Sequence, residues 1–313
     1  MESRSGRRRL RSSSPAEDRI SALPDDLILL ILVRLRSIAA AVRTSVLSRR
    51  WSGGLWTRLH EIVFRDLPFP SLEAALGRVD SPAVSLLEIR VPGLHRPDTH
   101  VRDPGFNSLL RAAARLAPEF VLRLPLDLTD NGSLVVDLPC FHRTASIVMD
   151  TYFLSLRVPD GVAFPALQTL SLAGRVPDLD PLLSCCPRLR TLRLRNVFRG
   201  GDLRVSSPWL QELFVVRLYQ RKHRIDIVAP VLKQLSMSFV SSGANISVLA
   251  PMAKKILWEC RYSKVPVVFV FGLWRLEQVT LRTAERQEHL RSLQICAHAV
   301  RLFSPLNLWQ SFD

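Results

Sequence analysis

The chain has 313 residues and a formal net charge of +15, and 47% of its residues are hydrophobic against 23% charged. This balance is typical of a folded globular protein and argues against an intrinsically disordered chain. No apolar run approaches the roughly 20 residues that a membrane-spanning helix requires, so we expect no membrane partner. Five cysteines at irregular spacing, with no apolar leader before Leu23, fit a reducing compartment. We therefore expect the protein in the nucleus, the cytoplasm or both.

Residues 1–18 are rich in arginine, and we expect them to form a disordered basic tail. Up to His60 the chain carries 12 arginines against five acidic residues, so almost half of its charge excess lies in its first fifth. Such a tail can act as a nuclear-import signal, an organellar transit peptide or a contact for polyanions, or it can simply keep the protein soluble.

Residues 23–51 begin with the most apolar helix predicted in the chain. Pro24 suits the first helical position, where its missing N–H is not needed, and Asp25 and Asp26 suit the positive end of the helix dipole. Seven apolar residues then follow from Leu27 to Val33, so this helix is apolar nearly all round. A segment of about 40 residues rarely forms a sufficient core alone. We expect another protein to cover part of this apolar surface.

Several separated residues of this segment resemble, in order, the F-box of plant F-box proteins. The matching residues are Leu23, Pro24, Leu27, Ile31, Leu35, Arg43, Val46, Ser48, Arg49, Arg50, Trp51, Leu55 and Trp56. The resemblance implies a three-helix module over residues 19–60 that docks on a Skp-type adaptor and, through it, on a cullin of a ubiquitin ligase. A plain helical hairpin is the alternative. The adaptor-binding residues that the resemblance implies are Leu23, Pro24, Leu27, Ile31 and Leu35 on the docking face, with Val46 and Trp51 in the packing and rim of the module.

Strands and helices alternate in the next part of the chain. The patterns predict strands over residues 59–69, 85–91 and 120–128, and helices over residues 71–79 and 108–117.

From residue 164 onward the chain repeats itself. Prolines at positions 165, 187, 208, 230 and 251 are 22, 21, 22 and 21 residues apart, and each precedes a leucine-rich stretch. A period in this range with the pattern L-x-x-L-x-L is that of leucine-rich repeats, whose short units stack into a shared core. We expect parallel strands beginning near Leu167, Leu189, Leu210 and Leu232, side by side in sequence order. A degenerate copy at residues 250–256 and a sixth around Leu276 follow, and the strands around residues 89, 122 and 147 are read as earlier, looser repeats.

Within one repeat, Leu189, Leu192 and Leu194 are expected to point inward and Arg193 and Arg195 outward. The proline before each strand fits a strand start, where no ladder donor is needed. The return segment 180–186 is expected to place two leucines and a cysteine in the core.

The chain as a whole thus resembles the plant F-box/leucine-rich-repeat class. This predicts an α/β protein in which the three-helix F-box precedes a solenoid with a curved parallel β-sheet over residues 61–313, clearest over residues 164–283. The resemblance implies a substrate-recognition subunit of a Skp-cullin-F-box ubiquitin ligase, whose solenoid binds a target protein.

Catalytic and metal-binding patterns are missing from the sequence. It contains no nucleophile elbow, no phosphate-binding glycine loop and no zinc-peptidase motif. Cys140 with His142, and Cys296 with His298, are Cys-x-His pairs, but a shared strand face explains them and no third orienting group is identifiable. We expect no enzyme activity, no cofactor and no metal.

The charge leaves a second hypothesis open, a basic nuclear scaffold or nucleic-acid-associated protein without a ligase role. Nucleic-acid binding requires a continuous basic face with interleaved aromatic residues. The expected outward positions are instead mixed: Ser171, Ala173, Arg193, Arg195, Phe214, Val216, Ser236, Ser238, Leu257, Glu259, Thr280 and Arg282. Nucleic acid is therefore disfavoured as a partner, and the candidate target-binding residues are Arg193, Arg195, Phe214 and Val216. The alternative for these four is that a loop covers the apolar pair while the arginines only solvate the sheet.

Overall fold

A computed structural model provides the structure of the chain. It describes residues 23–35, 38–44, 55–65, 67, 69–79, 84–91, 103–116, 118–124, 134–151, 154–174, 178–196, 202–219, 223–241, 244–262, 268–271, 275–287 and 290–301. The helices are α1 (Asp25–Arg34), α2 (Ile38–Arg43), the 3-10 helix η2 (Leu55–Arg58), α4 (Phe69–Arg78), α5 (Asp103–Ala114) and α6 (Leu179–Ser184). None of the helices in these ranges is long and apolar enough to cross a membrane.

Most strands belong to one long sheet that forms the spine of the molecule. Its strands are β1 (Glu61–Arg65), β2 (Leu86–Arg90), β3 (Glu119–Arg123), β5 (Ser146–Thr151), β7 (Thr169–Gly174), β8 (Thr191–Arg195), β10 (Glu212–Tyr219), β12 (Gln234–Ser241), β14 (Lys255–Tyr262), β17 (Leu290–Arg301) and β16 (Arg275–Gln287), in this spatial order. From β1 to β14 the strands are parallel and adjacent in sequence order. The four predicted strands are β7, β8, β10 and β12, so the repeat register is confirmed. The earlier repeats are β2, β3 and β5.

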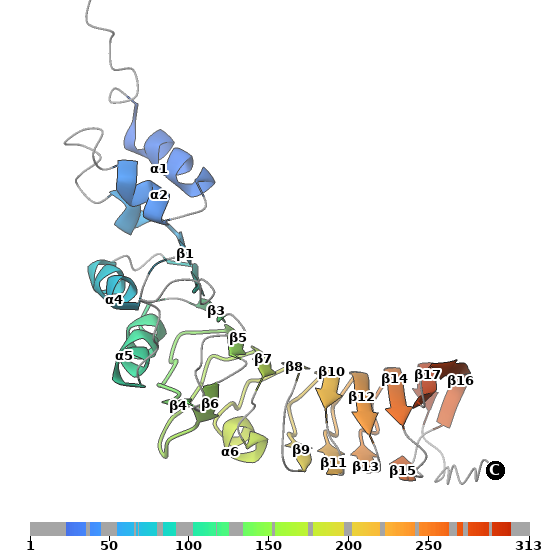
Figure 1. Cartoon of the computed structure of the whole chain (residues 1–313). Coiled ribbons are helices and arrows are strands. Elements are labelled where there is room, and N and C mark those ends of the chain that lie inside the picture. Colours follow the sequence, from blue (N-terminus) through green and yellow to red (C-terminus); the bar gives the residue numbers. More distant parts are fainter. Residues whose placement is uncertain are drawn as a thin grey trace, which may run out of the picture.

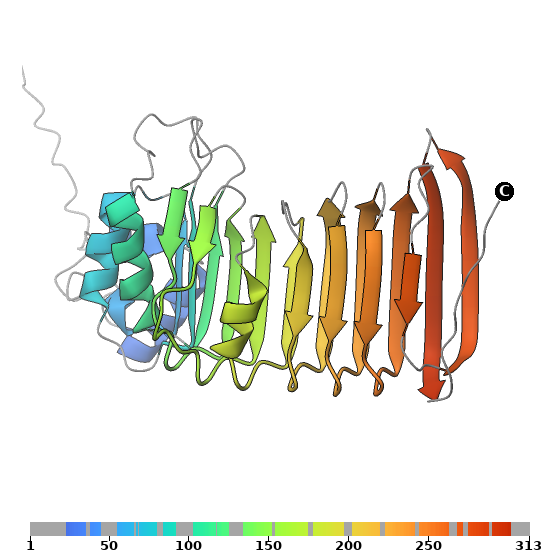
Figure 2. The ribbon, with the colours of Figure 1, turned by 90° about the horizontal axis from the view of Figure 1, so that it is seen from below.

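The side of the solenoid opposite this sheet changes from helices to strands along the chain (Figures 1 and 2). Helices α4, α5 and α6 serve as return segments in the first half, together with a small parallel pair, β4 (Leu134–Asp137) and β6 (Leu154–Arg157). Beyond α6 the return segments are β9 (Leu203–Ser206), β11 (His223–Val228), β13 (Ala244–Leu249) and β15 (Val268–Phe271), which form a second parallel sheet.

The switch from helix to strand follows the period of the apolar residues. In α5 the buried residues Phe106, Leu109, Leu110 and Ala113 occupy positions i, i+3, i+4 and i+7, which lie on one face of a helix. In β9 the buried and exposed residues alternate, with Leu203 and Val205 buried, which is the period of a strand facing a core.

The core lies between the two sides and is built from the same position in each repeat. Leu189, Leu192 and Leu194 are fully buried, as predicted. In the return segment, Leu182, Leu183 and Cys186 are buried as well. Each repeat therefore contributes apolar side chains that only its neighbours can cover, which is why the units are stable only when stacked.

The repeated proline occupies a turn and not the strand start, which corrects the sequence-based expectation. Four residue pairs show the turn: the N–H groups of Leu167, Leu189, Leu232 and Ala253 donate to the carbonyls of Phe164, Cys186, Ala229 and Ala250, respectively, at 3.1–3.3 Å. Proline is thus the second residue of each β-turn, a position that its fixed φ suits. The residues at the two ends of these turns are buried, whereas Pro165, Pro187, Pro208 and Pro230 are exposed.

The sixth repeat does not continue the parallel sheet, which is a second correction. Strand β17 lies between β14 and β16 and is antiparallel to both. Only residues 288 and 289 separate β16 from β17, and a connection this short joins antiparallel strands, because a parallel crossover needs about a dozen residues or more. The hairpin lies at one end of the row of strands, and α1 and α2 lie at the other (Figure 1).

Candidate protein-interaction surfaces

Helix α1 buries one side and leaves a broad apolar side exposed. Its first turn is closed by N–H groups of Leu27 and Ile28, which both donate to the carbonyl of Pro24 at 3.1 Å. Asp25 and Arg58 of η2 form an ion pair of 3.3 Å, which ties the start of the helix to the segment beneath it. Ile28 and Leu32 are buried, one turn apart, and attach the helix to the core.

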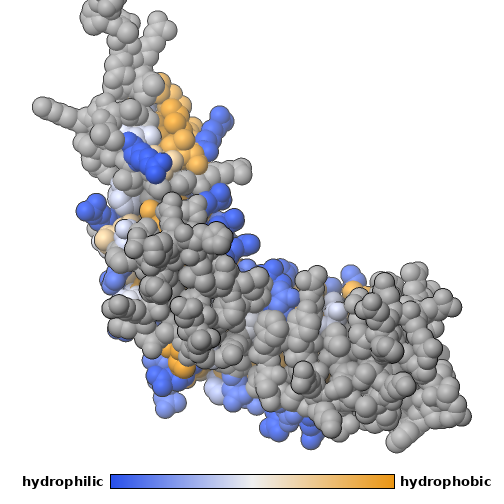
Figure 3. All heavy atoms as spheres, viewed as in Figure 1, coloured by the Kyte–Doolittle hydropathy of each residue, from blue (hydrophilic) through white to orange (hydrophobic). Residues whose placement is uncertain are grey.

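The exposed side of α1 carries five large aliphatic residues, each between 38% and 59% exposed: Leu27, Leu30, Ile31, Val33 and Leu35. Figure 3 shows an apolar patch at the position of α1. Leu27, Leu30 and Ile31 follow the i, i+3, i+4 spacing of one helix face. Such a contiguous apolar surface is typical of an interaction site.

The predicted docking residues are placed together where the structure describes them. Pro24, Leu27, Ile31 and Leu35 are exposed and Leu23 is half-buried. Val46 and Trp51 lie outside the described residues. Leu30 and Val33 were not singled out from the sequence although they belong to the same apolar run. Their exposure depends on which side of the helix meets the core, and this cannot be read from a run that is apolar all round.

The four predicted target-binding residues lie on the outer face of the long sheet, on two neighbouring strands. Arg193 of β8 is in register with Phe214 of β10, and Arg195 is in register with Val216. The guanidinium of Arg193 lies over the ring of Phe214, 5.1 Å from its centroid, at a distance suited to a cation–π contact. Val216 is 38% exposed and Phe214 is partly exposed. The two strands thus present a cation and two apolar side chains side by side.

Arg195 extends in the opposite direction, across strand β7. Its Nη2 lies 2.7 Å from Oδ1 of Asp150 on β5, and Ala173 of β7 is in register between the two residues. Ala173 is buried, as is Ser171, although both were expected to be exposed. A small side chain at position 173 leaves room for the arginine to pass over it, and the ion pair then covers this part of the sheet.

A second acidic residue neutralises arginines further along the same face. Glu88 of β2 is 11% exposed and forms ion pairs with Arg90 at 2.5 Å and with Arg123 at 3.7 Å. Sequence reasoning missed both Glu88 and Asp150. The repeat register would have identified them, because each follows an inward-facing residue by one position on its strand and therefore lies on the outer face of the sheet.

The cysteines show packing and no described metal site. Burial raises the pKa of the Cys186 thiol to about 12, so this thiol stays protonated at neutral pH and packs as a small apolar group. The Sγ of Cys140 accepts the N–H of Ala163 at 3.2 Å. Within the described ranges no three His, Cys, Asp or Glu side chains come together as a metal site. Cys296 and His298 lie on β17, where side chains are not described.

The fold is that of a leucine-rich-repeat protein whose first helix presents an exposed apolar face. A family model for the repeats of the FBD-associated F-box protein At5g56370 matches residues 119–256. Similar curated proteins from Arabidopsis thaliana include the F-box/LRR-repeat protein At3g03360, 32% identical over 71% of this chain and 47% of its own length. The FBD-associated F-box protein At5g44490 is 30% identical over 86% of this chain and 62% of its own length.

A third relative, the F-box protein At1g80960, is 30% identical over 74% of this chain and 46% of its own length. The chain thus spans about half to two thirds of the length of the curated relatives it matches. No solved structure gives a significant match. The repeat model and these relatives together support a plant family of F-box/leucine-rich-repeat proteins.

Proposed function

We propose that the chain is the substrate-recognition subunit of a Skp-cullin-F-box ubiquitin ligase. In this role the module at residues 19–60 docks on a Skp-type adaptor, which connects it to a cullin, and the solenoid binds a target protein for ubiquitination. The subunit itself performs no chemistry and needs no cofactor. We further propose that it works in the nucleus or the cytoplasm.

The observation that carries this proposal is the exposed apolar side of α1. Fully burying a large aliphatic side chain stabilises a complex by about 1.5–3 kcal/mol. Five such side chains, each roughly half-exposed, therefore offer on the order of 5 kcal/mol to a partner that covers them. The F-box in the names of the relatives supports an adaptor as that partner.

Co-purification of the full chain with a Skp adaptor tests the proposal. The double variant Leu27→Asp/Ile31→Asp places two charges on the exposed side of α1 and leaves its buried side intact. Adaptor binding is expected to fall below detection, because burying an unpaired carboxylate is strongly unfavourable. Retention of the adaptor by this variant, with an unchanged far-UV spectrum, would contradict the proposal.

A matched control is available on the second sheet. Val228 and Leu249 are 40% and 44% exposed and are in register on β11 and β13. Val228→Asp/Leu249→Asp therefore introduces the same charges at an equally exposed apolar pair, away from α1. This control is expected to bind the adaptor like the unsubstituted chain.

The sheet face favours a protein target over nucleic acid. Its arginines at positions 90, 123 and 195 are paired with Glu88 or Asp150, so the part of this face whose side chains are described offers no continuous row of free cations to a phosphate backbone. Arg193 beside Phe214 has instead the composition of protein-interface hot spots, in which arginine and aromatic residues are enriched.

A further inference from the structure

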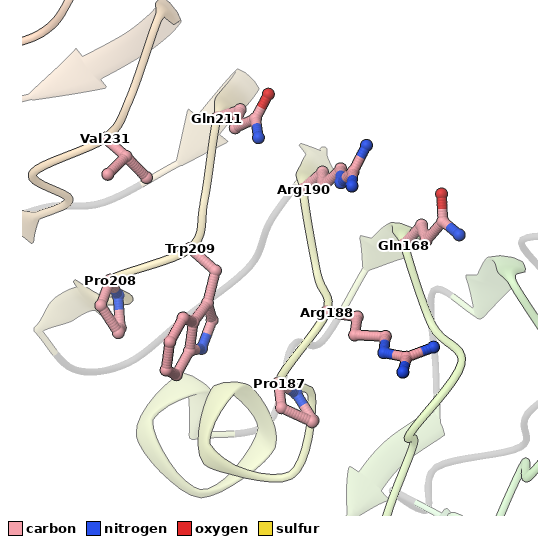
Figure 4. Close-up of a pocket in the computed structure, with 8 residues that line it drawn as sticks. All are labelled: Gln168, Pro187, Arg188, Arg190, Pro208, Trp209, Gln211 and Val231. Carbon is pink, nitrogen blue, oxygen red and sulfur yellow. The ribbon is translucent and has the colours of Figure 1, made fainter.

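A hollow of about 510 Å³ opens among the turns that connect successive repeats. It shares no residue with α1 or with the four residues on the sheet face. Its lining includes Arg188, Arg190, Trp209 and Gln211, together with the turn prolines 187 and 208. Figure 4 shows the indole of Trp209 lying between these two turns, with Arg190 and Gln211 pointing out from the strand starts.

Two rows of side chains run along the turns, through this hollow and beyond it, because the repeat places equivalent positions of successive turns side by side. The residue after each turn proline forms the first row, which begins with Ala166 and Arg188 and is apolar from Trp209 through Val231 to Met252. Trp209 is 49% exposed and Met252 is 55% exposed. Two large apolar side chains are therefore exposed to solvent next to the turn prolines.

The second row is polar and largely basic, and consists of Gln168, Arg190, Gln211, Lys233 and Lys254. The backbone holds this row in register, since the carbonyl of each of the first four residues accepts two N–H groups from the next repeat at 2.7–3.1 Å. Neighbouring members contact each other through their side chains as well: Nζ of Lys233 donates to Oε1 of Gln211 at 3.2 Å. Successive members are therefore about 4.8 Å apart, the spacing of adjacent strands.

The cations of these two rows differ from Arg90, Arg123 and Arg195 of the sheet face in having no acidic partner among the described residues. Arg188, Arg190, Lys233 and Lys254 are exposed. Over the ranges that the structure describes, no carboxylate forms an ion pair with any of the four, whereas Arg195 is paired with Asp150. A groove that brings cations without acidic partners beside exposed apolar side chains fits a ligand that is both acidic and partly apolar.

We propose that this groove binds an extended acidic segment of a partner protein, with glutamate or aspartate side chains facing the basic row and aliphatic side chains facing Trp209 and Met252. Arg190 and Lys233 are two strands apart, about 10 Å, and an extended chain rises about 3.3 Å per residue. Acidic residues three positions apart therefore match this pair. One of the two residues between them then lies against Trp209, which belongs to the intervening repeat.

A single-stranded nucleic acid fits the groove less well. It requires successive aromatic platforms on which bases stack, and the apolar row offers one ring followed by Val231 and Met252. The chain's own N-terminal segment is basic, so charge repulsion excludes it as the occupant. The proposal does not depend on docking of the adaptor, and the Leu27→Asp/Ile31→Asp variant is expected to bind the acidic segment unchanged.

Fluorescence anisotropy on the full chain tests the proposal. The probe is a fluorescein-labelled peptide with glutamate at every third position and leucine and serine between, and the comparison peptide carries glutamine in place of glutamate. We expect the glutamate peptide to bind at least about tenfold more tightly, with affinity falling as salt is raised. Arg188→Glu/Arg190→Glu is expected to weaken binding by about tenfold or more, and Trp209→Ala by several-fold.

The matched control is Arg143→Glu/Arg204→Glu, which makes the same change of charge at two exposed arginines outside the groove. It is expected to change the affinity by less than about twofold. Equal binding of the glutamine peptide, or equal loss in the control variant, would overturn the proposal. So would tighter binding of a labelled oligouridine that depends on Arg188, Arg190 and Trp209, which would identify a nucleic-acid site instead.

Discussion

Arg195 and Asp150 form an ion pair of 2.7 Å that bridges two strands separated by a third. The strand between them contributes Ala173, whose side chain is too small to block the path and is buried beneath the pair. The pair thus links three consecutive repeats on the face of the sheet. Arg193 and Arg195 of the same strand therefore have different partners. Arg195 reaches back to Asp150 of β5, whereas Arg193 contacts Phe214 of β10.

A double-mutant cycle measures the energy of this pair. Asp150→Asn, Arg195→Gln and the double variant are compared by urea denaturation. The arginine side chain is 44% exposed and the carboxylate 14% exposed, so solvent screens the interaction and we expect a coupling free energy of about 0.3–1 kcal/mol. The coupling is expected to shrink in about 1 M salt. Strict additivity of the two single variants at low salt would show that the pair contributes nothing.

The turn prolines and the inward leucines are expected to stabilise the solenoid by different mechanisms. Leu213→Ala removes a fully buried side chain and should lower the free energy of unfolding by about 2–5 kcal/mol. Pro230→Ala removes an outward-facing ring and acts through the unfolded chain, so it should cost about 0.4–1 kcal/mol. Chemical denaturation of both variants checks the contrast, and an equal loss in the two would contradict the turn assignment.

Asp137 and Arg157 predict a pH dependence at low pH. The guanidinium of Arg157 donates to both oxygens of this carboxylate, at 2.5 and 2.8 Å, and this hydrogen bonding lowers the pKa of Asp137 against a smaller opposing effect of burial. The unfolded state then binds the proton more tightly than the folded state. The stabilising contribution is therefore complete above about pH 4 and is lost as the pH falls through the lowered pKa.

Carboxyl NMR titration tests this pair directly. Arg157→Gln is expected to raise the pKa of Asp137 towards its ordinary value, while Arg143→Gln, a change at another exposed arginine, should leave it in place. A pKa for Asp137 that does not respond to Arg157→Gln would show that the contact does not persist in solution.

Thiol reactivity should distinguish Cys186 from Cys140. Cys186 is fully buried and its pKa is raised to about 12, so only about one molecule in ten thousand carries the thiolate at pH 8. Cys140 is half-buried. Alkylation with iodoacetamide followed by peptide mass spectrometry is expected to label Cys140 in the native protein and Cys186 only after unfolding. Native labelling of both at the same rate would place Cys186 outside the core.

The repeat register was predictable because its physical cause is periodic. One proline every 21 or 22 residues and a fixed leucine spacing specify the strands that stack, whatever connects them. The end of the sheet was not predictable by the same argument, because the residues around Leu276 keep the leucine spacing while the short connection to β17 imposes an antiparallel pairing. The spacing of apolar residues indicates which residues face the core, but it does not indicate whether a strand runs parallel or antiparallel to its neighbour.

In the candidate sites, too, some features could be predicted from the sequence and others could not. Alternation placed Arg193, Arg195 and Val216 on the exposed face correctly, since it depends only on the pleat of one strand. Burial of Ala173 depends instead on Arg195, 22 residues further along the chain, and on Asp150, 23 residues before it. To predict such a contact between repeats, one must know the register of three neighbouring strands as well as the identity of each residue.

The last prediction concerns target recognition by the sheet face. The side chains of Arg193 and Phe214 contact each other, and both are at least partly exposed. If this pair binds the target, Arg193→Glu/Phe214→Ala should abolish target ubiquitination in a reconstituted ligase, because it reverses the charge and removes the aromatic anchor together. Co-purification with the adaptor and the thermal midpoint should stay close to those of the unsubstituted chain. The control Arg204→Glu/Val228→Ala makes the same kinds of change on the second sheet and should retain ubiquitination. A simultaneous loss of ubiquitination, adaptor binding and thermal stability would mean that Arg193 and Phe214 hold the sheet together and that the target binds elsewhere.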